Sequence, residues 1–329
     1  MTSTSVGTRP KVLVTRRLPK VVEAALTTLF DATLSGDDHQ MDAGELQRAL
    51  GAADGILCTL TDRLTAEVLA AYPIRTRILA NFGVGVDHID LAAARAHDIV
   101  VTNTPGVLTD DTADLTMTLM LALLRRAGEG EREVRGGRWT GWRPTHLLGR
   151  RVTGRTLGIV GTGRIGRAVA RRAHHGFGMR VLMWGRTMPD QASLQAVGAE
   201  PAASLDALLA ASDIVSLHVP GGEATRNLID ARRLAMMPPG GFLINTACGS
   251  VVDVDALVAS LLAGHLAGAG LDVYPREPEV ERRLLGMDQV VLLPHLGSAT
   301  REGREEMGML AVANLEAFFA GRHPDNVVR

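Results

Sequence analysis

The stretch Gly161-Thr-Gly163-Arg-Ile-Gly166 follows a short apolar run, Thr156–Val160, and precedes a helical pattern over residues 164–173. In such a strand–turn–helix the first glycine permits a tight turn, the second lets the backbone approach a pyrophosphate, and the third allows close helix–strand packing. The start of the helix also offers unpaired N–H groups and a partial positive charge to phosphate oxygens. The stretch therefore predicts a dinucleotide-binding turn, and a purely structural turn is the alternative.

The end of the next predicted strand, Arg180–Trp184, bears on which dinucleotide would bind. NAD-binding domains usually carry an acidic residue there, which binds the ribose 2′-hydroxyl. This chain continues instead with Gly185, Arg186 and Thr187. Arg186 is able to pair with a 2′-phosphate, and Thr187 to donate a hydrogen bond to it. We therefore expect NADP, with NAD as the alternative; a solvated loop arginine is the other interpretation of Arg186.

Short β-branched runs alternate with helical stretches along most of the chain. Alternation of this kind indicates parallel strands with crossover helices, and it predicts an α/β fold with two doubly wound, Rossmann-like parallel-sheet domains. The expected strands are residues 11–15, 55–59, 77–81, 99–102, 156–160, 180–184, 213–218, 241–245, 268–271 and 290–292, and the helices expected between the first of them are residues 20–30, 65–72 and 90–97.

The middle of the chain has a different texture. A helix is expected over residues 111–126, with Asp110 or Asp111 as its cap, and apolar residues occupy nearly all of its faces. A helix of that kind is either deeply buried or shared between subunits. Residues 128–155, rich in Gly, Arg and Trp, predict an irregular arm, and the last helix is expected at about residues 300–321.

Composition limits the classes of function. The 329 residues suffice for two domains. The 35 basic and 36 acidic side chains leave a net charge of −1, which predicts no binding to nucleic acid or to an anionic membrane. The two cysteines, Cys58 and Cys248, are too few for a disulfide framework or a Cys-rich zinc site, and no metal is expected.

Membrane insertion and export are not predicted either. The longest apolar run, residues 115–124, contains Thr116 and Thr118 and falls short of the roughly 20 residues that a spanning helix needs. Residues 1–9 are rich in Thr and Ser and lack an apolar segment, so a flexible tail is expected there rather than a signal peptide. We expect a cytoplasmic protein.

Several motifs are spread over nearly the whole chain. They are the glycine turn, Asn81-Phe-Gly-Val-Gly-Val-Asp87, Asn103-Thr-Pro-Gly-Val-Leu-Thr-Asp110, Trp139-Thr-Gly-Trp142, Leu271-Asp272-Val273 and Pro294-His295-Leu-Gly-Ser-Ala-Thr300. Together they resemble the D-isomer-specific 2-hydroxyacid dehydrogenase family, most closely its glyoxylate/hydroxypyruvate reductase branch.

The resemblance implies a discontinuous substrate-binding domain, residues 1–104 and 295–329, around a dinucleotide-binding domain, residues 105–294. The active site would lie in a cleft between the two domains. A dimerisation arm at about residues 111–150 would form a homodimer, and Trp142 would reach toward the substrate pocket of the neighbouring subunit.

Reduction of a 2-oxo acid needs a hydride at the carbonyl carbon and a proton at the carbonyl oxygen, and an imidazole exchanges protons near neutral pH. Of the ten histidines, only His295 stands in a motif that the family uses for acid/base catalysis. By the same resemblance Glu277 matches the acid that hydrogen-bonds this imidazole. The histidines without motif support, expected to be structural, are His174, His175, His218 and His265.

The resemblance also implies an arginine that binds the substrate carboxylate, a task suited to the planar guanidinium. In Asn245-Thr-Ala-Cys248-Gly249, Cys248 occupies that position. Three alternatives stay open. The enzyme is impaired or engineered, with a loss of roughly 10²–10³ in rate; or another arginine, such as Arg304, supplies the charge; or Cys248 is a nucleophile, which requires a low-pKa thiolate.

Further contacts follow by position in the family. The N–H groups of Val84 and Gly85 would bind the substrate carboxylate, and Leu60 would shape the pocket. Phosphite dehydrogenases carry a lysine at the position of Val84, so phosphite is not the expected substrate. The implied cofactor contacts are Gly161, Gly163, Arg164, Ile165, Gly166, Arg186, Thr187, Val219, Pro220, Thr225, Thr112, Ala247, Asp272 and Gly297.

The predicted function is therefore an NADP(H)-preferring reduction of a small 2-oxo acid, glyoxylate or hydroxypyruvate. The alternative is a catalytically weak or inactive dinucleotide sensor on the same fold, similar to the transcriptional co-repressors related to this family. Cys248 favours the sensor, whereas the retained His295 and Glu277 favour the reductase.

Overall fold

The computed structural model describes residues 9–70 and 73–328. The chain divides into two compact units, Met1–Leu108 with Thr300–Arg329 (unit 1) and Thr109–Ala299 (unit 2). The domain boundaries expected after residues 104 and 294 lie a few residues before the boundaries between the two units. The chain changes unit where a helix starts, at α5 (Thr109–Leu124) and at α13 (Arg301–Phe319). Of the tail expected over residues 1–9, only Arg9 is among the described residues. Tyr72, at the end of the helix expected over residues 65–72, lies outside them.

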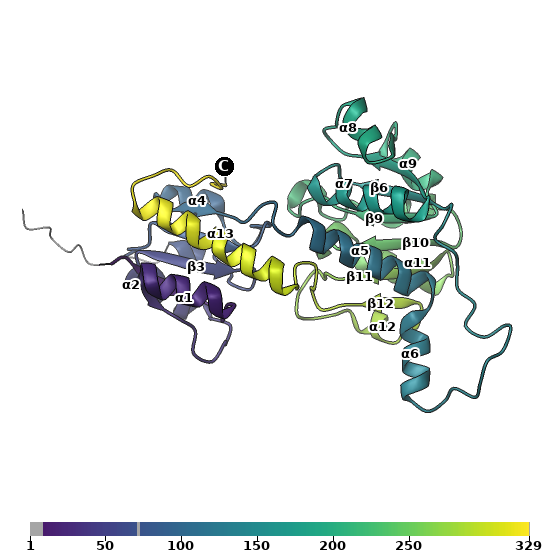
Figure 1. The fold of residues 1–329 in the computed structure, drawn as a ribbon, viewed down its shortest axis with the longest axis horizontal. Helices are drawn as coiled ribbons and strands as arrows, with labels where there is room; N and C mark the ends of the chain where they lie inside the picture. The colour runs from purple at the N-terminus through teal and green to yellow at the C-terminus, as the bar shows by residue number, and fades with distance from the viewer. Residues whose placement is uncertain (1–8, 71–72, 329) are drawn as a thin grey trace, which may run out of the picture. The chain divides into compact units, whose positions relative to one another are not determined.

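Unit 1 is built on a five-stranded parallel sheet in the order β2-β1-β3-β4-β5. Figure 1 labels the central strand, β3. Its strands are β1 (Lys11–Val14), β2 (Asp31–Thr33), β3 (Gly55–Thr59), β4 (Ile78–Phe82) and β5 (Val100–Thr102). One face packs against α1 (Lys20–Leu29) and α13, and the other against α2 (Ala43–Ala52), α3 (Ala66–Leu69) and α4 (Leu91–Ala96). The winding direction changes between β1 and β3, so loops that follow these strands meet at one edge of the sheet.

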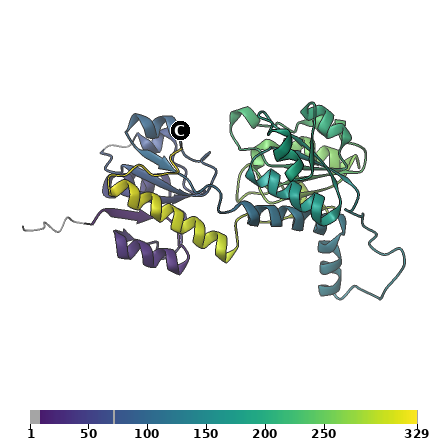
Figure 2. The same ribbon diagram turned by 45° about the horizontal axis from the view of Figure 1, so that its top comes forward.

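Helices α1 and α13 lie side by side although they come from opposite ends of the chain (Figure 1 and Figure 2). Gly308 of α13 packs so close to Val22 of α1 that an added Cβ would overlap the valine side chain. Met307, Val312 and other apolar residues of α13 join the buried cluster beneath. The last helix thus completes the core of the unit that the first strands begin.

Unit 2 is built on a seven-stranded parallel sheet in the order β12-β11-β10-β9-β6-β7-β8. Its strands are β6 (Thr156–Val160), β7 (Arg180–Trp184), β8 (Ala199–Pro201), β9 (Ile214–Leu217), β10 (Gly241–Asn245), β11 (Leu266–Leu271) and β12 (Val290–Leu292). The winding direction changes between β6 and β9, where the strand order of a doubly wound sheet leaves a crevice for a ligand. The two parallel sheets confirm the predicted fold class.

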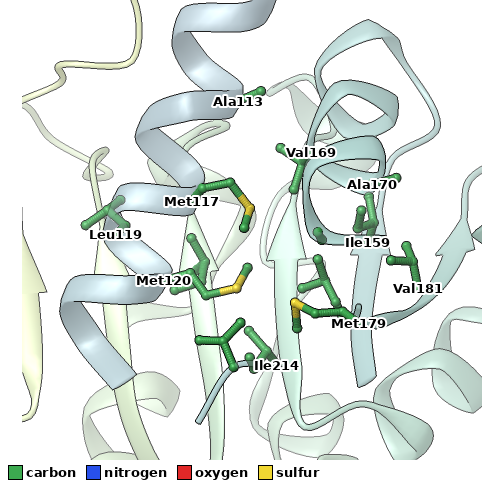
Figure 3. Close-up of a cluster of buried hydrophobic side chains, with 14 of the residues drawn as sticks. Ala113, Met117, Leu119, Met120, Ile159, Val169, Ala170, Met179, Val181 and Ile214 are labelled. Atoms are coloured by element: carbon green, nitrogen blue, oxygen red, sulfur yellow. The ribbon is translucent and has the colours of Figure 1, made fainter. Parts of the chain in front are cut away.

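Helices cover both faces of the unit 2 sheet. On one face α5 packs against α7 (Arg164–Arg171), and Figure 3 shows Met117 and Met120 of α5 directed toward Val169 of α7 and Ile159 of β6. This cluster also includes the apolar residue Leu194 of α8 (Gln191–Ala196). The other face carries α9 (Leu205–Ala211), α10 (Ala231–Met236), α11 (Val254–Leu262) and α12 (Arg282–Leu285).

Several elements of the structure have no counterpart in the sequence prediction, among them strands β2 and β8 and helix α2. Strands β2 and β8 have three residues each and lie at sheet edges, too short to show an alternating pattern. Helix α2 had a usable signal, because Asp42 and Glu45 form a capping box at its start.

The prediction of an irregular arm over residues 128–155 is wrong at its start, where α6 (Ala127–Arg135) forms. This helix has no buried residue, and ion pairs of Arg126 with Glu129 and of Arg135 with Glu131 support it in place of an apolar face. Figure 1 shows α6 and the loop after it extending away from the sheet of unit 2.

The cap predicted for α5 is also wrong. The helix begins at Thr109, so Asp110 and Asp111 lie in its first turn, where negative charge suits the helix dipole. Asp110 pairs with Arg172 at 2.9 Å, which ties α5 to the end of α7. Over the described part of the chain, none of the helices has the length and apolar character to cross a membrane.

Candidate active site

The glycine turn of unit 2 lies between the carboxyl ends of β6 and β9. Gly161 has a φ of 116°, and an added Cβ there would overlap the His218 carbonyl oxygen at the end of β9. An added Cβ on Gly166 would overlap the carbonyl of Gly161, so this glycine lets α7 approach the turn. Gly163 has no heavy atom within 4 Å of its Cβ position. Two glycines therefore close the turn and the third leaves its outer side open, as the approach of a pyrophosphate requires.

The first turn of α7 completes this part of the site. Gly163 is the N-cap of α7 and supplies no side chain to cover the first N–H groups. Arg164 is exposed and Ile165 is partly buried against the core. The unpaired N–H groups of the helix start thus face the open side of the turn, an arrangement suited to anions.

The loop after β7 is bound to the glycine turn. Thr162 Oγ1 donates to the Thr187 carbonyl at 2.8 Å. Arg186 and Thr187 are exposed, and no described residue forms an ion pair or hydrogen bond with the Arg186 guanidinium. An unpaired guanidinium on a loop that is bound to the turn suits a phosphate on the adenosine ribose.

The loop after β9 borders the same crevice. Val219 is partly buried, Pro220 is exposed, and the hydroxyl of Thr225 donates to the Pro220 carbonyl at 2.7 Å. Thr225 is 7% exposed, so its side chain shapes the loop from within. Its predicted contact with a cofactor remains a prediction. His218 lies at the base of this loop, and burial lowers the pKa of this imidazole to about 3.

His295 and Glu277 lie within hydrogen-bonding distance at the carboxyl end of β12. His295 Nδ1 is 2.8 Å from Glu277 Oε2, and the other carboxylate oxygen accepts the Tyr274 N–H at 2.9 Å. Burial acts to raise the pKa of Glu277, but the hydrogen bond and charge of His295 outweigh it, and the pKa lies below its ordinary value. An ionised Glu277 holds a proton on Nδ1, which leaves Nε2 as the nitrogen for proton transfer.

Asp272 and Thr112 fix the backbone that follows His295. Asp272 accepts the N–H groups of Leu296 and Gly297 at 2.7 and 2.8 Å, and the Asp272 carbonyl accepts the His295 N–H at 2.9 Å. Thr112 Oγ1 donates to the Gly297 carbonyl at 2.9 Å. The side chains that the resemblance assigns to the cofactor therefore also hold the residue predicted to transfer the proton.

Cys248 lies in a tight loop directly after β10. Asn245 closes the loop, since its Nδ2 donates to the Cys248 carbonyl at 2.9 Å and its Oδ1 accepts the Ala247 N–H at 3.0 Å. The Cys248 thiol is partly exposed, with Sγ 3.3 Å from Ser250 Oγ.

The Cys248 loop packs on the segment that bears Glu277. The Cβ position of Gly249 coincides with the main chain of Tyr274, whose N–H binds Glu277. Cys248 is therefore held on the backbone that supports the His295–Glu277 pair. A thiol has no planar pair of donors for a carboxylate, so this position alone does not perform the task of an arginine.

In unit 1 the residues that the resemblance assigns to the substrate lie at the carboxyl edge of the sheet. Val84 and Gly85 are exposed in the loop after β4, and no described residue accepts a hydrogen bond from either N–H. Asn81 Nδ2 donates to the Gly85 carbonyl at 2.9 Å, and Asn103 Nδ2 donates to the Val84 carbonyl at 2.9 Å. Two fixed and unpaired N–H groups form a suitable site for a carboxylate.

Leu60 and Arg304 lie in the same unit. Leu60 is 39% exposed in the loop after β3. The Arg304 guanidinium carbon lies 5.8 Å from the ring centre of Phe82, which ends β4 just before the loop of Val84. Arg304 is thus a positive charge close to the loop that the resemblance assigns to the substrate carboxylate.

Several residues of the site were not singled out in the sequence. Asn81, Asn103 and Asn245 each fix a loop at the end of a strand, and Thr162 joins two loops. The available signal was a polar residue at the end of an apolar strand, as with Asn81 and Asn245. No group of three or more His, Cys, Asp or Glu side chains among residues 9–70 and 73–328 is arranged to hold a metal ion.

Comparisons with known proteins agree with these features. Residues 117–297 match the family described as D-isomer specific 2-hydroxyacid dehydrogenase, NAD binding domain. The chain is 42% identical over 324 residues to the glyoxylate reductase of Thermococcus litoralis, covering 97% of both chains. It is 44% identical to the glyoxylate reductase of Thermococcus onnurineus, covering 97% of this chain and 96% of the relative.

Solved structures show the same likeness. An NADPH-dependent glyoxylate/hydroxypyruvate reductase from Sinorhizobium meliloti, in complex with NADP and malonate, superimposes with a TM-score of 0.86 at 37% identity, covering 98% and 97% of the two chains. A glyoxylate reductase from Paecilomyes thermophila gives a TM-score of 0.86 at 32% identity, covering 97% and 98%. These matches confirm the resemblance drawn from the motifs: the chain is a 2-hydroxyacid dehydrogenase and belongs to the D-isomer specific 2-hydroxyacid dehydrogenase family.

Proposed function

We propose that this enzyme uses NADPH to reduce glyoxylate or hydroxypyruvate to the corresponding 2-hydroxy acid, as a cytoplasmic homodimer. The observation that carries the proposal is the His295–Glu277 pair, with its 2.8 Å contact, at the carboxyl edge of the sheet that also carries the glycine turn. Unit 2 is then the dinucleotide-binding domain and unit 1 the substrate-binding domain.

His295 is the general acid of this proposal. Reduction leaves an oxyanion that needs a proton, and Nε2 of a doubly protonated imidazole supplies it. The Glu277 carboxylate stabilises the imidazolium form through Nδ1. Asp272 and Thr112 hold the backbone after His295, which limits the directions in which the imidazole turns.

The dinucleotide site uses the open side of the glycine turn for the pyrophosphate and Arg186 for a 2′-phosphate. When bound, the nicotinamide supplies the hydride. The turn excludes side chains from the phosphate position, and the first N–H groups of α7 compensate phosphate charge. Ala247 and Gly297 are proposed to border the nicotinamide end, and Val219 and Pro220 the adenosine end.

The substrate carboxylate is proposed to bind the N–H groups of Val84 and Gly85, with Leu60 lining the pocket. Both N–H groups lack a protein acceptor in the described part of the chain. Arg304 adds positive charge near this loop and is one candidate for compensation of the missing arginine.

Dimer formation is proposed through the arm of unit 2. Trp139, Trp142 and Leu148 are 54, 82 and 66% exposed. Large apolar side chains gathered on one exposed segment mark an interaction surface. A second copy of this chain is the proposed partner, and Trp142 is proposed to enter the partner's substrate pocket.

A steady-state assay tests the proposed function. The oxidation of NADPH and of NADH is followed by absorbance with glyoxylate, hydroxypyruvate, pyruvate and phenylpyruvate in turn. Turnover of glyoxylate or hydroxypyruvate, faster with NADPH, is the expected result. Measurable NADPH binding without turnover of any of the four acids would instead favour the alternative, a dinucleotide sensor, which Cys248 makes the second candidate.

A further inference from the structure

The segment that bears Cys248 runs beside the loop after β9. The N–H of Asn227 donates to the Ser250 carbonyl at 2.8 Å, and the N–H of Ile229 to the Val251 carbonyl at 3.0 Å. Ile229 also forms a parallel β-bridge with Val252. Arg226 directly precedes Asn227, and its backbone therefore lies beside the loop of Cys248, Gly249 and Ser250.

Arg226 places a positive charge beside Cys248. Its side chain is 57% exposed, and Nη2 lies 2.6 Å from Glu223 Oε1. The hydrogen bond to Glu223 and the charge of that carboxylate raise the pKa of Arg226, and the ionised form of Cys248 acts in the same direction. Together with the backbone contact between Asn227 and Ser250, this places the guanidinium within electrostatic range of Cys248.

The partner of Arg226 is easily exchanged. Glu223 is three residues before Arg226 in the same loop, with its side chain 84% exposed. Exposed ion pairs of this kind contribute little to stability. A substrate carboxylate that approaches Cys248 would offer the guanidinium two oxygen acceptors, as the Glu223 carboxylate does.

We propose that Arg226 binds the carboxylate of the 2-oxo acid and so replaces the arginine that this chain lacks at position 248. The inference rests on the proposed function. A cysteine side chain is much shorter than an arginine and supplies no positive charge at position 248. The resemblance implies that the family places this positive charge at position 248, after β10. In this chain Arg226, in the loop after β9, supplies it instead.

Steady-state kinetics of Arg226→Gln and Arg226→Lys test the inference. Arg226→Gln is expected to lower kcat/KM for glyoxylate by about tenfold or more, mainly through KM, since a charge-assisted contact is lost. Arg226→Lys keeps the charge and should retain part of the activity. Arg232→Gln is the matched control, because Arg232 is also 57% exposed and pairs with Asp206; it should stay within about twofold.

A double-mutant cycle with Cys248→Arg separates this role from others. With arginine restored at position 248, Arg226→Gln should no longer change kcat/KM for glyoxylate. Three results would overturn the inference: an unchanged loss in the Cys248→Arg background, a loss confined to KM for NADPH, or no effect of Arg226→Gln in the parent enzyme.

The parent enzyme itself distinguishes this inference from the proposed function. Turnover by Cys248→Arg alongside an inactive parent would show that Arg226 does not substitute, while the reductase assignment would stand. No turnover of any 2-oxo acid by either protein would overturn both.

Discussion

Asp272 Oδ2 accepts the N–H of Gly297 at 2.8 Å, while Oδ1 accepts the N–H of Leu296 at 2.7 Å. These contacts fix the backbone directly after His295, which has a left-handed conformation with a φ of 55°. Positive φ is unusual for a residue with a Cβ. The buried carboxylate thus orients the imidazole by holding the chain that follows it.

Replacing Asp272 with alanine should reduce both stability and activity. The substitution leaves two N–H groups without an acceptor at a site where Asp272 is 1% exposed, and each such group costs about 1–3 kcal/mol. We expect the free energy of unfolding in urea to fall by about 2–5 kcal/mol. The control is Asp255→Ala, whose side chain is 78% exposed; it should change stability by about 0.5 kcal/mol or less. An Asp272→Ala variant as stable as the control would contradict the role.

Arg186→Gln should weaken the preference for NADPH. Loss of the charge-assisted contact to the 2′-phosphate is expected to lower kcat/KM for NADPH by about 10–100-fold, with little change for NADH. Arg180→Gln at the opposite end of β7 is the control, since Arg180 is 57% exposed and paired with Glu200. Equal losses with the two dinucleotides would show that Arg186 does not read the 2′-phosphate.

The sequence predicts the two sheets because their strands are buried. Strands such as β6 and β10 read as continuous apolar runs, and a parallel sheet with helices on both faces requires such runs. The turn after β6 was recognisable because its glycines have separate steric tasks, visible in the contacts of Gly161 and Gly166. Helix α6 escaped prediction because charge pairs support it, which leaves no apolar period to detect.

The supporting contacts of the site could not be predicted from the sequence. Thr162 meets Thr187 only because β6 and β7 are neighbours in the sheet. Arg226 lies close to the loop of Cys248 only because the chain after β9 pairs with the chain after β10, as in the bridge between Ile229 and Val252. Family motifs give the identity of the reacting residues, whereas such registers follow from tertiary packing.

Glu277→Gln should change the pH dependence of reduction. His295 lowers the pKa of Glu277, so by reciprocity the Glu277 carboxylate favours the protonated imidazole. Reduction requires that proton, and kcat/KM should therefore fall as pH rises and His295 loses it. Without the carboxylate the fall should occur at lower pH. A pH profile of kcat/KM for glyoxylate measures this shift. If a folded Glu277→Gln variant loses activity over the same pH range as the parent enzyme, the proposed effect of Glu277 on His295 is contradicted.

Trp142→Ala should weaken the proposed dimer. The Trp142 side chain is 82% exposed on the arm, and a buried tryptophan at an interface commonly contributes about 2 kcal/mol or more, roughly 30-fold in Kd. Sedimentation velocity over a range of concentrations measures the change. Leu262→Ala is the control, because Leu262 is 69% exposed on α11 of the same unit and is not part of the arm segment. Loss of activity together with dissociation would indicate that Trp142 also serves the partner's pocket, whereas a parent protein that is monomeric at all concentrations would exclude the arm as a dimer interface.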